Sequence, residues 1–250
     1  MKALITGASG GIGRDIALIL SRMGYDLILV SRNTEKLAQV KKHLKTNVQI
    51  ISADLSVEEE CFSLYEAVKE QDIEILVNNA GFGAFGPFWE VPLERELNML
   101  NLNVRAVHIL TKLFLEEFRK KDSGYILNVA SSAGFLAGPL MATYYATKNY
   151  VLRLTEAIYE ELRKDGSNVH ISALCPGPVD TGFNDRAGVK FTLPGLRSFD
   201  VAKYAVEGMF ANKVVMIPGV AMKLALLSQK FLCEKTLLKA AYYFQHKKKG

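Results

Sequence analysis

The sequence predicts an α/β fold in which a single domain is built on a doubly wound parallel sheet with helices on both faces. Short apolar runs rich in β-branched residues alternate with amphipathic helical patterns along most of the chain. Some of these runs, such as residues 27–30, are apolar at every position, as strands covered on both faces require. The length of 250 residues, with 49% hydrophobic and 23% charged residues, suits one large globular domain.

Strands and helices are predicted in regular alternation. The strands are expected at Lys2–Ile5, Asp26–Val30, Val48–Ser52, Ile75–Val77, Gly124–Val129 and His170–Leu174. The helical patterns cover about Gly11–Met23, Thr34–Leu44, Val57–Lys69, Glu94–Arg119 and Tyr144–Lys164. Residues 184–200 differ, because they show little periodicity and contain two glycines and a proline, so we expect a long loop or lid there.

Charge and cysteine content exclude several classes of protein. The net charge of +5 comes without a basic stripe interleaved with aromatic residues, so we expect no nucleic-acid partner. Cys61, Cys175 and Cys233 are few, odd in number and far apart, which indicates a reducing compartment, and we expect a cytoplasmic protein. None of them has a second cysteine or a histidine at ligand spacing, so no metal site is predicted. The chain begins with a strand pattern instead of a signal peptide, and no run reaches the roughly 18 apolar residues of a spanning helix.

The most informative segment is the glycine-rich turn at residues 6–13, Thr-Gly-Ala-Ser-Gly-Gly-Ile-Gly, between the first strand and the first helix. Bare backbone lets a pyrophosphate approach, and the unpaired N–H groups of the helix face it. The spacing of Gly7, Gly11 and Gly13 differs from the G-x-G-x-x-G dinucleotide fingerprint. A tight turn without a ligand is the alternative, but the flanking strand and helix favour a nucleotide site.

The ends of the next three strands add cofactor-binding candidates. Ser31 and Arg32 follow the second strand, where an NAD site commonly has an acidic residue. The guanidinium of Arg32 instead suits a 2′-phosphate, so NADP is favoured over NAD. The alternative is that Arg32 is only a solvated surface charge. Asp54 and Leu55 end the third strand, where an adenine edge would lie. The fourth strand is followed by Asn78-Asn79-Ala80-Gly81, whose small and amide residues can admit a cofactor and tie strands together, although such a sequence also makes an ordinary turn.

Tyr144 and Lys148 are the candidates for proton transfer. They are four residues apart, which on a helix puts both side chains on one face. A phenol ionises near pH 10, and a nearby ammonium favours the phenolate, so that the tyrosine can exchange protons near neutral pH. Ser131, one connection upstream, can bind a substrate oxygen with its hydroxyl. A tyrosine and a lysine at this spacing are by themselves more often a surface pair.

The ordered set of motifs favours a catalytic role for Tyr144 and Lys148 over a surface pair. The glycine turn, residues 78–81, Asn103, Ser131, the Tyr144-x-x-x-Lys148 pair and Pro176-Gly177 resemble the short-chain dehydrogenase/reductase family, from Lys2 to about Thr181. The resemblance implies a Rossmann-type domain with a sheet of about seven parallel strands. It also depends on register, because only Tyr144, and not Tyr145, lies four residues before Lys148, and only Ser131, and not Ser132, keeps the usual spacing to the tyrosine.

The resemblance assigns roles residue by residue. Tyr144 would be the acid/base, Lys148 would bind the nicotinamide ribose, Ser131 would orient the substrate carbonyl, and Asn103 would hold a water that relays protons to Lys148. The pyrophosphate turn would be lined by Gly7, Ser9, Gly11, Ile12 and Gly13, and Asn79 would lie beside the adenosine ribose with Ala80 and Gly81 adjoining it. Residues 176–181 would close over the nicotinamide amide, with Pro176, Gly177, Val179 and Thr181 in contact.

The expected substrate is hydrophobic. Phe82, Phe85, Phe135 and Leu136 follow strand ends, where an open α/β sheet binds its ligand, and predict an apolar pocket. The sequence therefore predicts an NADP-dependent oxidoreductase acting on a steroid-like, fatty-acyl or aromatic carbonyl or secondary alcohol. A non-catalytic NADP-sensing protein and an epimerase or dehydratase are the alternatives. By analogy with the family we expect a homodimer or homotetramer formed through the helices at residues 94–119 and 144–164.

The last 31 residues depart from the family pattern. Many members end in a short strand near Asp-Gly-Gly, whereas here residues 214–219 are followed by a basic, apolar tail, so the usual C-terminal tetramer contact is in doubt. We expect residues 1–219 to form the dinucleotide-binding and catalytic unit and residues 220–250 to be an amphipathic, basic helical extension of the same domain. Packing of its apolar face on the domain or on a second subunit is favoured over contact with a membrane surface or a cover for an apolar substrate.

Overall fold

The computed structural model describes residues 1–183, 187–188 and 195–246, and every structural statement concerns these residues. Its centre is a seven-stranded parallel sheet with the order β3-β2-β1-β4-β5-β6-β9. The strands are β1 (Lys2–Thr6), β2 (Asp26–Val30), β3 (Val48–Ile51), β4 (Ile73–Asn78), β5 (Gly124–Val129), β6 (Val169–Leu174) and β9 (Val215–Met216). Because the strand order reverses between β1 and β4, their carboxyl ends flank the crevice in which such folds bind ligands.

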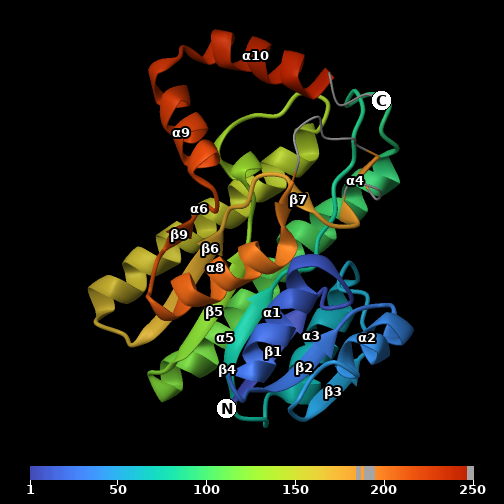
Figure 1. Ribbon diagram of the computed structural model, residues 1–250, viewed down its shortest axis with the longest axis vertical. Helices are drawn as coiled ribbons and strands as arrows, with labels where there is room; N and C mark the ends of the chain where they lie inside the picture. Colours follow the sequence, from blue (N-terminus) through green and yellow to red (C-terminus); the bar gives the residue numbers. More distant parts are fainter. Residues whose placement is uncertain (184–186, 189–194, 247–250) are drawn as a thin grey trace.

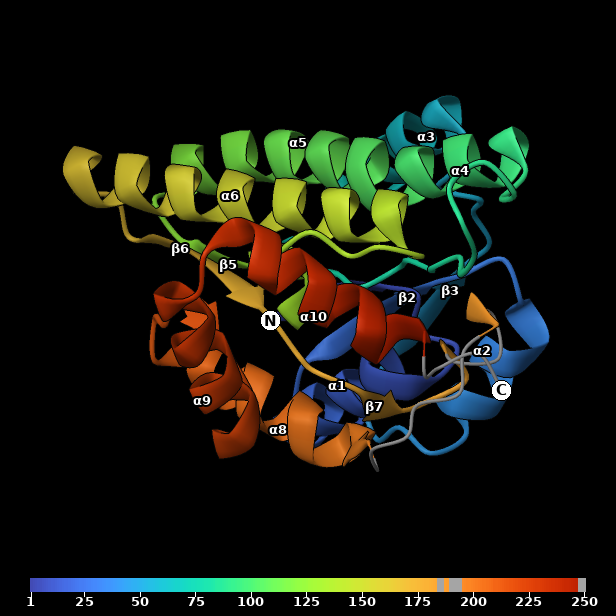
Figure 2. The same ribbon diagram turned by 90° about the horizontal axis from the view of Figure 1, so that it is seen from above.

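Helices cover both faces of the sheet, as predicted (Figure 2). One face carries α1 (Gly11–Arg22), α2 (Thr34–Lys41) and α8 (Ser198–Phe210), and the other carries α3 (Glu58–Val68), α5 (Val107–Lys121) and α6 (Ala142–Asp165). The expected α/β architecture is therefore confirmed, with helix ends within a few residues of their predicted positions except as described below.

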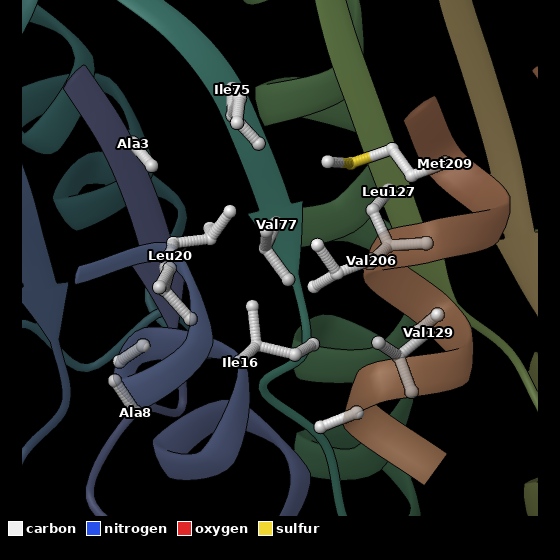
Figure 3. Packing of buried hydrophobic residues seen from close by; sticks show 14 of the residues in the cluster. Ala3, Ala8, Ile16, Leu20, Ile75, Val77, Leu127, Val129, Val206 and Met209 are labelled. Carbon is white, nitrogen blue, oxygen red and sulfur yellow. The ribbon is translucent and has the colours of Figure 1, made fainter. Parts of the chain in front are cut away.

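Two hydrophobic clusters explain why the strands are apolar at every position. On one face, Ile5 and Val77 pack with Ile16 of α1 and with Val206 and Met209 of α8 (Figure 3). On the other face, the alternate strand residues, among them Leu4, Leu76 and Ile126, pack with Phe114 and Phe118 of α5. Consecutive strand residues point to opposite faces, so both faces of this sheet are buried.

The predicted helix at residues 94–119 is not a single regular helix. It consists of α4 (Leu93–Leu100), a π-helical turn η1 (Asn101–Ala106) and α5, in one continuous path. A π-turn widens the backbone spiral by one residue and is frequent at functional sites. Here it contains Asn103, which is fully buried.

The segment expected as a long loop is more regular than its composition suggested. Residues 184–186 and 189–194 lie outside the described residues. Leu196–Arg197 forms β8, which pairs in parallel with β7 (Val179–Asp180), and residues 198–200 are already the first turn of α8. The expectation of a loop to residue 200 was therefore wrong at its C-terminal end, and α8 itself was not predicted, although its buried positions 201, 202, 205, 206 and 209 repeat with helical spacing.

The C-terminal segment forms α9 (Val220–Ser228), a short 3₁₀ turn η3 (Gln229–Phe231) and α10 (Glu234–His246). These helices lie beyond the carboxyl ends of the sheet strands, with α10 outermost (Figure 1). Leu226 and Gln245 are their buried side chains, while most of their large apolar residues are exposed. Most of these residues therefore do not pack on their own domain, and packing on a second subunit, the other part of the favoured expectation, stays a prediction. The boundary at residue 219 remains a prediction.

No helix in the described part of the chain is long and apolar enough to cross a membrane. The three cysteines are free, and the described residues contain no group of histidine, cysteine and acidic side chains that could hold a metal ion.

Candidate active site

The glycine turn is clamped to the end of β4 by side-chain hydrogen bonds. The Thr6 hydroxyl oxygen accepts hydrogen bonds from the backbone N–H groups of Asn79 and Ala80, both at 3.0 Å. The Asn79 amide in turn donates to the carbonyl oxygens of Thr6 (3.0 Å) and Gly7 (3.1 Å). Asn79, expected beside the adenosine ribose, therefore uses its amide N–H groups to hold the turn in place.

Two of the three motif glycines are required by this close packing. A Cβ atom on Gly7 would lie 2.9 Å from the Cα of Ala80, and its backbone has φ +65°. A Cβ on Gly13 would overlap the Asn79 amide. A third contact joins Gly11, where a Cβ would lie 3.0 Å from the Thr181 methyl group. The turn, the end of β4 and the segment after β6 are thus in contact, as the predicted site requires.

The N-terminus of α1 fits the pyrophosphate of a dinucleotide. Gly10 precedes the helix in extended conformation, and a Cβ atom there would meet nothing within 4 Å. No side chain among the described residues caps the helix, and its first turn contains no acidic residue. The free N–H groups and the positive end of the helix dipole are therefore available to an anion. Ile12, expected to line the turn, packs partly against the core beneath it.

The strand ends beyond the turn bring basic and hydroxyl groups together. The Ser31 hydroxyl donates to the Ser9 hydroxyl oxygen at 3.1 Å, so the ends of β1 and β2 are joined. Beside Ser9 lies a hollow of about 340 Å³ whose lining includes Arg14, Lys36 and His43. Lys36 offers its positive charge to an added phosphate group there, whereas the guanidinium of Arg14 is paired with the carboxylate of Asp15 at 2.8 Å.

Arg32 has a partner that its sequence position did not reveal. Its guanidinium lies 3.3 Å from the carboxylate of Asp54, with the two side chains 60% and 32% exposed. Burial acts to raise the pKa of Asp54, but hydrogen bonds from Ser56 and the charge of Arg32 outweigh it and hold the pKa below its usual value. Because an exposed pair of this kind contributes about 1 kcal/mol at most, Arg32 is free to turn toward a phosphate. Leu55, by contrast, is buried in the core.

Tyr144 and Lys148 are both buried on the face of α6 that points toward the sheet. The ammonium nitrogen of Lys148 lies 5.9 Å from the centre of the Tyr144 ring and donates a hydrogen bond to the carbonyl oxygen of Val129 at 2.8 Å. Only 9% of Tyr144 and 5% of Lys148 is exposed. They are therefore not the surface pair that this spacing most often makes, and the end of β5 fixes the lysine.

Burial sets the protonation of both side chains. It raises the pKa of Tyr144 well above the ordinary value of a phenol, and a hydrogen bond with Ser131 offsets only part of this rise. Burial also lowers the pKa of Lys148 to about 8. The expected lowering of the tyrosine pKa by the lysine is therefore not the net result for the protein alone. The neutral phenol, a proton donor, is the favoured form.

Asn103 holds the chain that leaves β4. Its amide nitrogen donates to the carbonyl oxygen of Phe82 (2.8 Å) and to the hydroxyl of Thr147 (3.2 Å), and its amide oxygen accepts from the N–H of Phe82 (3.1 Å). Gly81 lies between Asn103 and Lys148, since a Cβ there would be 3.0 Å from the amide oxygen and 3.6 Å from the ammonium. The side chain of Asn103 thus positions the segment that borders Lys148, and its expected water contact stays a prediction.

Ser131 begins the short 3₁₀ helix η2 (Ser132–Phe135) and faces the segment after β6. Its hydroxyl oxygen accepts from the N–H of Ala133 at 3.1 Å, and the hydroxyl reaches the carbonyl of Pro176 at 3.4 Å. The N–H of Ser132 donates to the same carbonyl at 2.8 Å. Further along the segment, Val179 is buried and Thr181 contacts Gly11, while Gly177 packs against Met222 of α9.

The apolar residues divide between two clusters. Phe82 and Phe85 pack with Tyr144 and Met141, so they lie where a substrate-facing role requires. Phe135 belongs to a different cluster, with Val151 and Leu152 of α6, and the carbonyl of Leu136 accepts a hydrogen bond from Asn149. Phe135 is therefore not brought together with Phe82 and Phe85, and the substrate-facing role of Leu136 stays a prediction.

Sequence reasoning missed two side chains next to the tyrosines. The ring of Phe183 lies 5.4 Å from that of Tyr144, which its position two residues after Thr181 would have suggested. Gln245, at the end of α10, is 3% exposed and donates a hydrogen bond to the hydroxyl of Tyr145, while its amide oxygen has no partner among the described residues. No local signal marks Gln245, because this contact joins residues 100 positions apart.

Comparison with known proteins agrees with this geometry. The short chain dehydrogenase family profile matches residues 1–190. An uncharacterized oxidoreductase of Staphylococcus epidermidis is 33% identical over 181 residues, covering 72% of this chain and 78% of that protein. Estradiol 17-beta-dehydrogenase 11 of Rattus norvegicus is 31% identical over 235 residues, covering 91% of this chain and 78% of that protein.

Solved structures are similar over almost the whole chain. A short-chain dehydrogenase from Sphingobium yanoikuyae in complex with NADPH has a TM-score of 0.82 and 30% identity, covering 92% of both chains. A short-chain dehydrogenase/reductase from Burkholderia phymatum in complex with NAD has a TM-score of 0.83 and 28% identity, covering 90% of both chains. The chain belongs to the short-chain dehydrogenase/reductase family, and it is an oxidoreductase of that family with the NAD(P) site typical of it.

Proposed function

We propose that this protein transfers a hydride between NADP(H) and the carbonyl or secondary alcohol carbon of a hydrophobic substrate, with Tyr144 as the proton donor or acceptor. The observation that carries the proposal is the convergence of the buried Tyr144 and Lys148 with the half-buried Ser131 at the carboxyl ends of β4 and β5, beside the N-terminus of α1, which no described side chain caps. When bound, the nicotinamide supplies or accepts the hydride.

The residues of this chain supply the proton and the electrostatics. In reduction, the neutral phenol of Tyr144 donates its proton to the substrate oxygen while Ser131 donates a hydrogen bond to the same oxygen. Lys148, whose pKa of about 8 leaves it mostly protonated at pH 7, stabilises the negative charge that develops on the phenol. Asn103 keeps the segment at Gly81 in place beside Lys148 and so acts as a positioning residue.

The preference for NADP rests on Arg32, with the basic hollow beside Ser9 as support. Arg32→Ala should raise the KM for NADPH by about tenfold or more, since a charge-assisted contact contributes roughly 1.5–3 kcal/mol, and leave the KM for NADH within about twofold. Asp54→Asn frees the guanidinium of its partner and should lower the KM for NADPH. An equal effect of Arg32→Ala on both cofactors would contradict the preference.

The preference for an apolar substrate rests on the aromatic side chains of Phe82, Phe85 and Phe183, which pack in one cluster with Tyr144. The named relative that acts on estradiol is in accord with a steroid-like carbonyl or alcohol. A panel of carbonyl compounds, followed by the loss of NADPH absorbance, tests this. Turnover should be highest with aromatic, steroid-like and fatty-acyl ketones, and turnover restricted to small charged substrates would contradict the proposal.

We also propose a homo-oligomer formed through α4, α5 and α6. Leu93 and Leu97 of α4 are 69% and 50% exposed and line a hollow of about 390 Å³ on the outer surface. Exposed leucines around a hollow are typical of a surface that another protein covers. Light scattering of the purified protein should give a dimer or tetramer, and Leu93→Glu/Leu97→Glu should give the monomer.

A further inference from the structure

The net positive charge of this protein comes from its last 31 residues. Residues 220–250 contain seven lysines and one glutamate, a formal charge of +6. Residues 1–219 contain 24 basic and 25 acidic residues, a formal charge of −1. The net charge of +5 therefore describes a nearly neutral catalytic body that carries a strongly basic C-terminal segment.

The helix α9 presents an apolar stripe to solvent. Val220, Leu224, Leu227 and Phe231 recur at intervals of three or four residues, which places them on one side of the helix and the turn that follows it. They are 72%, 61%, 53% and 83% exposed. The opposite side is the one that packs, since Leu226 is buried and Met222 lies against Gly177.

The helix α10 continues the same chemistry. Leu238, Tyr242 and Phe244 are 38%, 49% and 67% exposed, and Lys235 and Lys239 are exposed beside them. Its most buried side chain is the polar Gln245, and Leu237, Ala240 and Ala241 are only half-buried, so that little of the apolar surface of this helix packs on the domain. Exposed aromatic and aliphatic residues interleaved with lysines are the composition of helices that lie in a membrane interface.

We infer that α9 and α10 form a docking surface for an anionic lipid bilayer, on which the protein lies without crossing it. The apolar stripe would enter the boundary between headgroups and acyl chains, and the lysines would contact the anionic headgroups. This surface lies beyond the carboxyl ends of the strands (Figure 1), and the site lies at the same ends, because Lys148 bonds to Val129 at the end of β5. The inference therefore deepens the proposed function, because a substrate dissolved in the bilayer would meet the protein at the end where its site lies.

A second copy of the chain is a less suitable occupant of this surface. A twofold dimer brings the same patch of both copies together, and here each patch belongs to a segment of charge +6. Two such segments repel each other, whereas an anionic surface attracts the lysines and supplies the counter-charge they need. Charge complementarity thus selects the bilayer, and an oligomer formed through this surface is an outcome that the experiment detects.

Co-sedimentation of the full chain with vesicles tests the inference without requiring turnover. The protein should bind phosphatidylcholine vesicles that contain phosphatidylglycerol and should bind pure phosphatidylcholine at least about tenfold more weakly. Leu224→Ser/Leu227→Ser/Phe231→Ser and, separately, Lys235→Glu/Lys239→Glu should each reduce binding by about tenfold or more. High salt should weaken binding of the unaltered protein, because it screens the lysines.

Matched variants and a second assay make the result decisive. Phe62→Ser, at an exposed residue of α3, and Lys42→Glu/Lys45→Glu, on exposed lysines after α2, should bind as the unaltered protein does. Equal binding to both vesicle types, or loss of binding in these controls, would overturn the inference. So would an oligomer that becomes monomeric only in the α9 variant. Turnover of a water-soluble ketone should be the same in every variant, so a failure of vesicle binding is distinguishable from a failure of the proposed activity.

Discussion

The strand-end site and the C-terminal helices differ in how their side chains are held. At the site, Tyr144, Lys148 and Asn103 are at most 9% exposed, and hydrogen bonds fix the lysine ammonium and both ends of the asparagine amide. In α9 and α10, Leu226 and Gln245 are the buried side chains, and Phe231 is 83% exposed. Contacts in the protein interior fix the side chains of the site, whereas few internal contacts hold the C-terminal helices.

This difference indicates that the buried site carries out the chemical step and that the C-terminal helices make contacts outside the chain. A buried, hydrogen-bonded constellation is preorganised for a charge that develops during the reaction, so changes there should reduce turnover or stability. A region with little internal packing contributes little to stability and is suited to contacts outside the chain. Changes in α9 and α10 should therefore alter affinity for substrate or surface and leave the chemical step unchanged.

The largest effect should come from Tyr144→Phe. Removing the proton donor should lower kcat by about a thousandfold, since general acid catalysis contributes roughly 10²–10⁴, and should change NADPH affinity by less than about threefold. The matched control is Tyr145→Phe, which removes the neighbouring hydroxyl and should keep kcat within about tenfold. Steady-state kinetics measure kcat, and cofactor fluorescence measures the affinity for NADPH. A kcat that Tyr144→Phe leaves unchanged would contradict the assignment of Tyr144.

The next largest effect should be on stability, from Asn103→Leu. The substitution leaves the backbone N–H and carbonyl of Phe82 without partners in a partly buried place, and the free energy of unfolding should fall by about 3 kcal/mol. Asn101→Leu, two residues earlier in the same π-turn, removes no hydrogen bond recorded among the described residues and should change it by less than about 0.5 kcal/mol. Urea unfolding measures the free energy of unfolding of both variants. Equal decreases would show that the hydrogen bonds from Asn103 to Phe82 do not account for the effect of Asn103→Leu.

A smaller, pH-dependent effect should distinguish Lys148. Its pKa of about 8 in the folded protein lies below the ordinary value of 10.5, so between these pH values the unfolded chain binds a proton that the folded protein has lost. Stability linked to Lys148 therefore rises with pH across this window, on the order of 1 kcal/mol per pH unit.

The unfolding free energy of the unaltered protein, compared with that of Lys148→Met, measures this effect. The difference should shift in favour of the unaltered protein from pH 8 to pH 10. Lys120, which is 69% exposed, is the control, and Lys120→Met should give no such rise. A difference for Lys148→Met that stays constant with pH would show that the lysine is not desolvated in the folded protein.

The smallest effect belongs to the contact between the two regions. Gln245→Leu removes the polar anchor of α10 on Tyr145 and should change the KM for bulky apolar ketones about two- to fivefold, with kcat unchanged, because one neutral hydrogen bond contributes about 1 kcal/mol. Tyr145→Phe removes the same bond from the other side. In a double-mutant cycle the effects of the two substitutions on KM should not be additive. Additive effects would show that Gln245 does not act through Tyr145.

The sheet and the tyrosine–lysine pair could be predicted from the sequence because their signals are local. Strands covered on both faces are apolar at every position, and the spacing of Tyr144 and Lys148 places both on one helix face whatever surrounds them. The glycine turn was found for the same reason, since Gly7 needs a positive φ and close packing that glycine alone provides.

The remaining features depend on contacts between distant residues. Asp54 pairs with Arg32 across two strand ends, and Gln245 reaches Tyr145 from the far end of the chain, so neither partner is visible locally. The π-turn at Asn103 is a shift in backbone hydrogen bonding that leaves the apolar pattern of the helix unchanged. The pKa of Tyr144 was misjudged because the sequence shows the nearby charge and not the depth of burial.

A crystal structure of the complex with NADP⁺ tests the central claim most directly. The account predicts the pyrophosphate at the N-terminus of α1 beside Gly10, the ammonium of Lys148 on the nicotinamide ribose, and the Tyr144 hydroxyl within about 4 Å of the reacting carbon of the ring. A dinucleotide bound elsewhere, or a Tyr144 hydroxyl turned away from the nicotinamide, would contradict it.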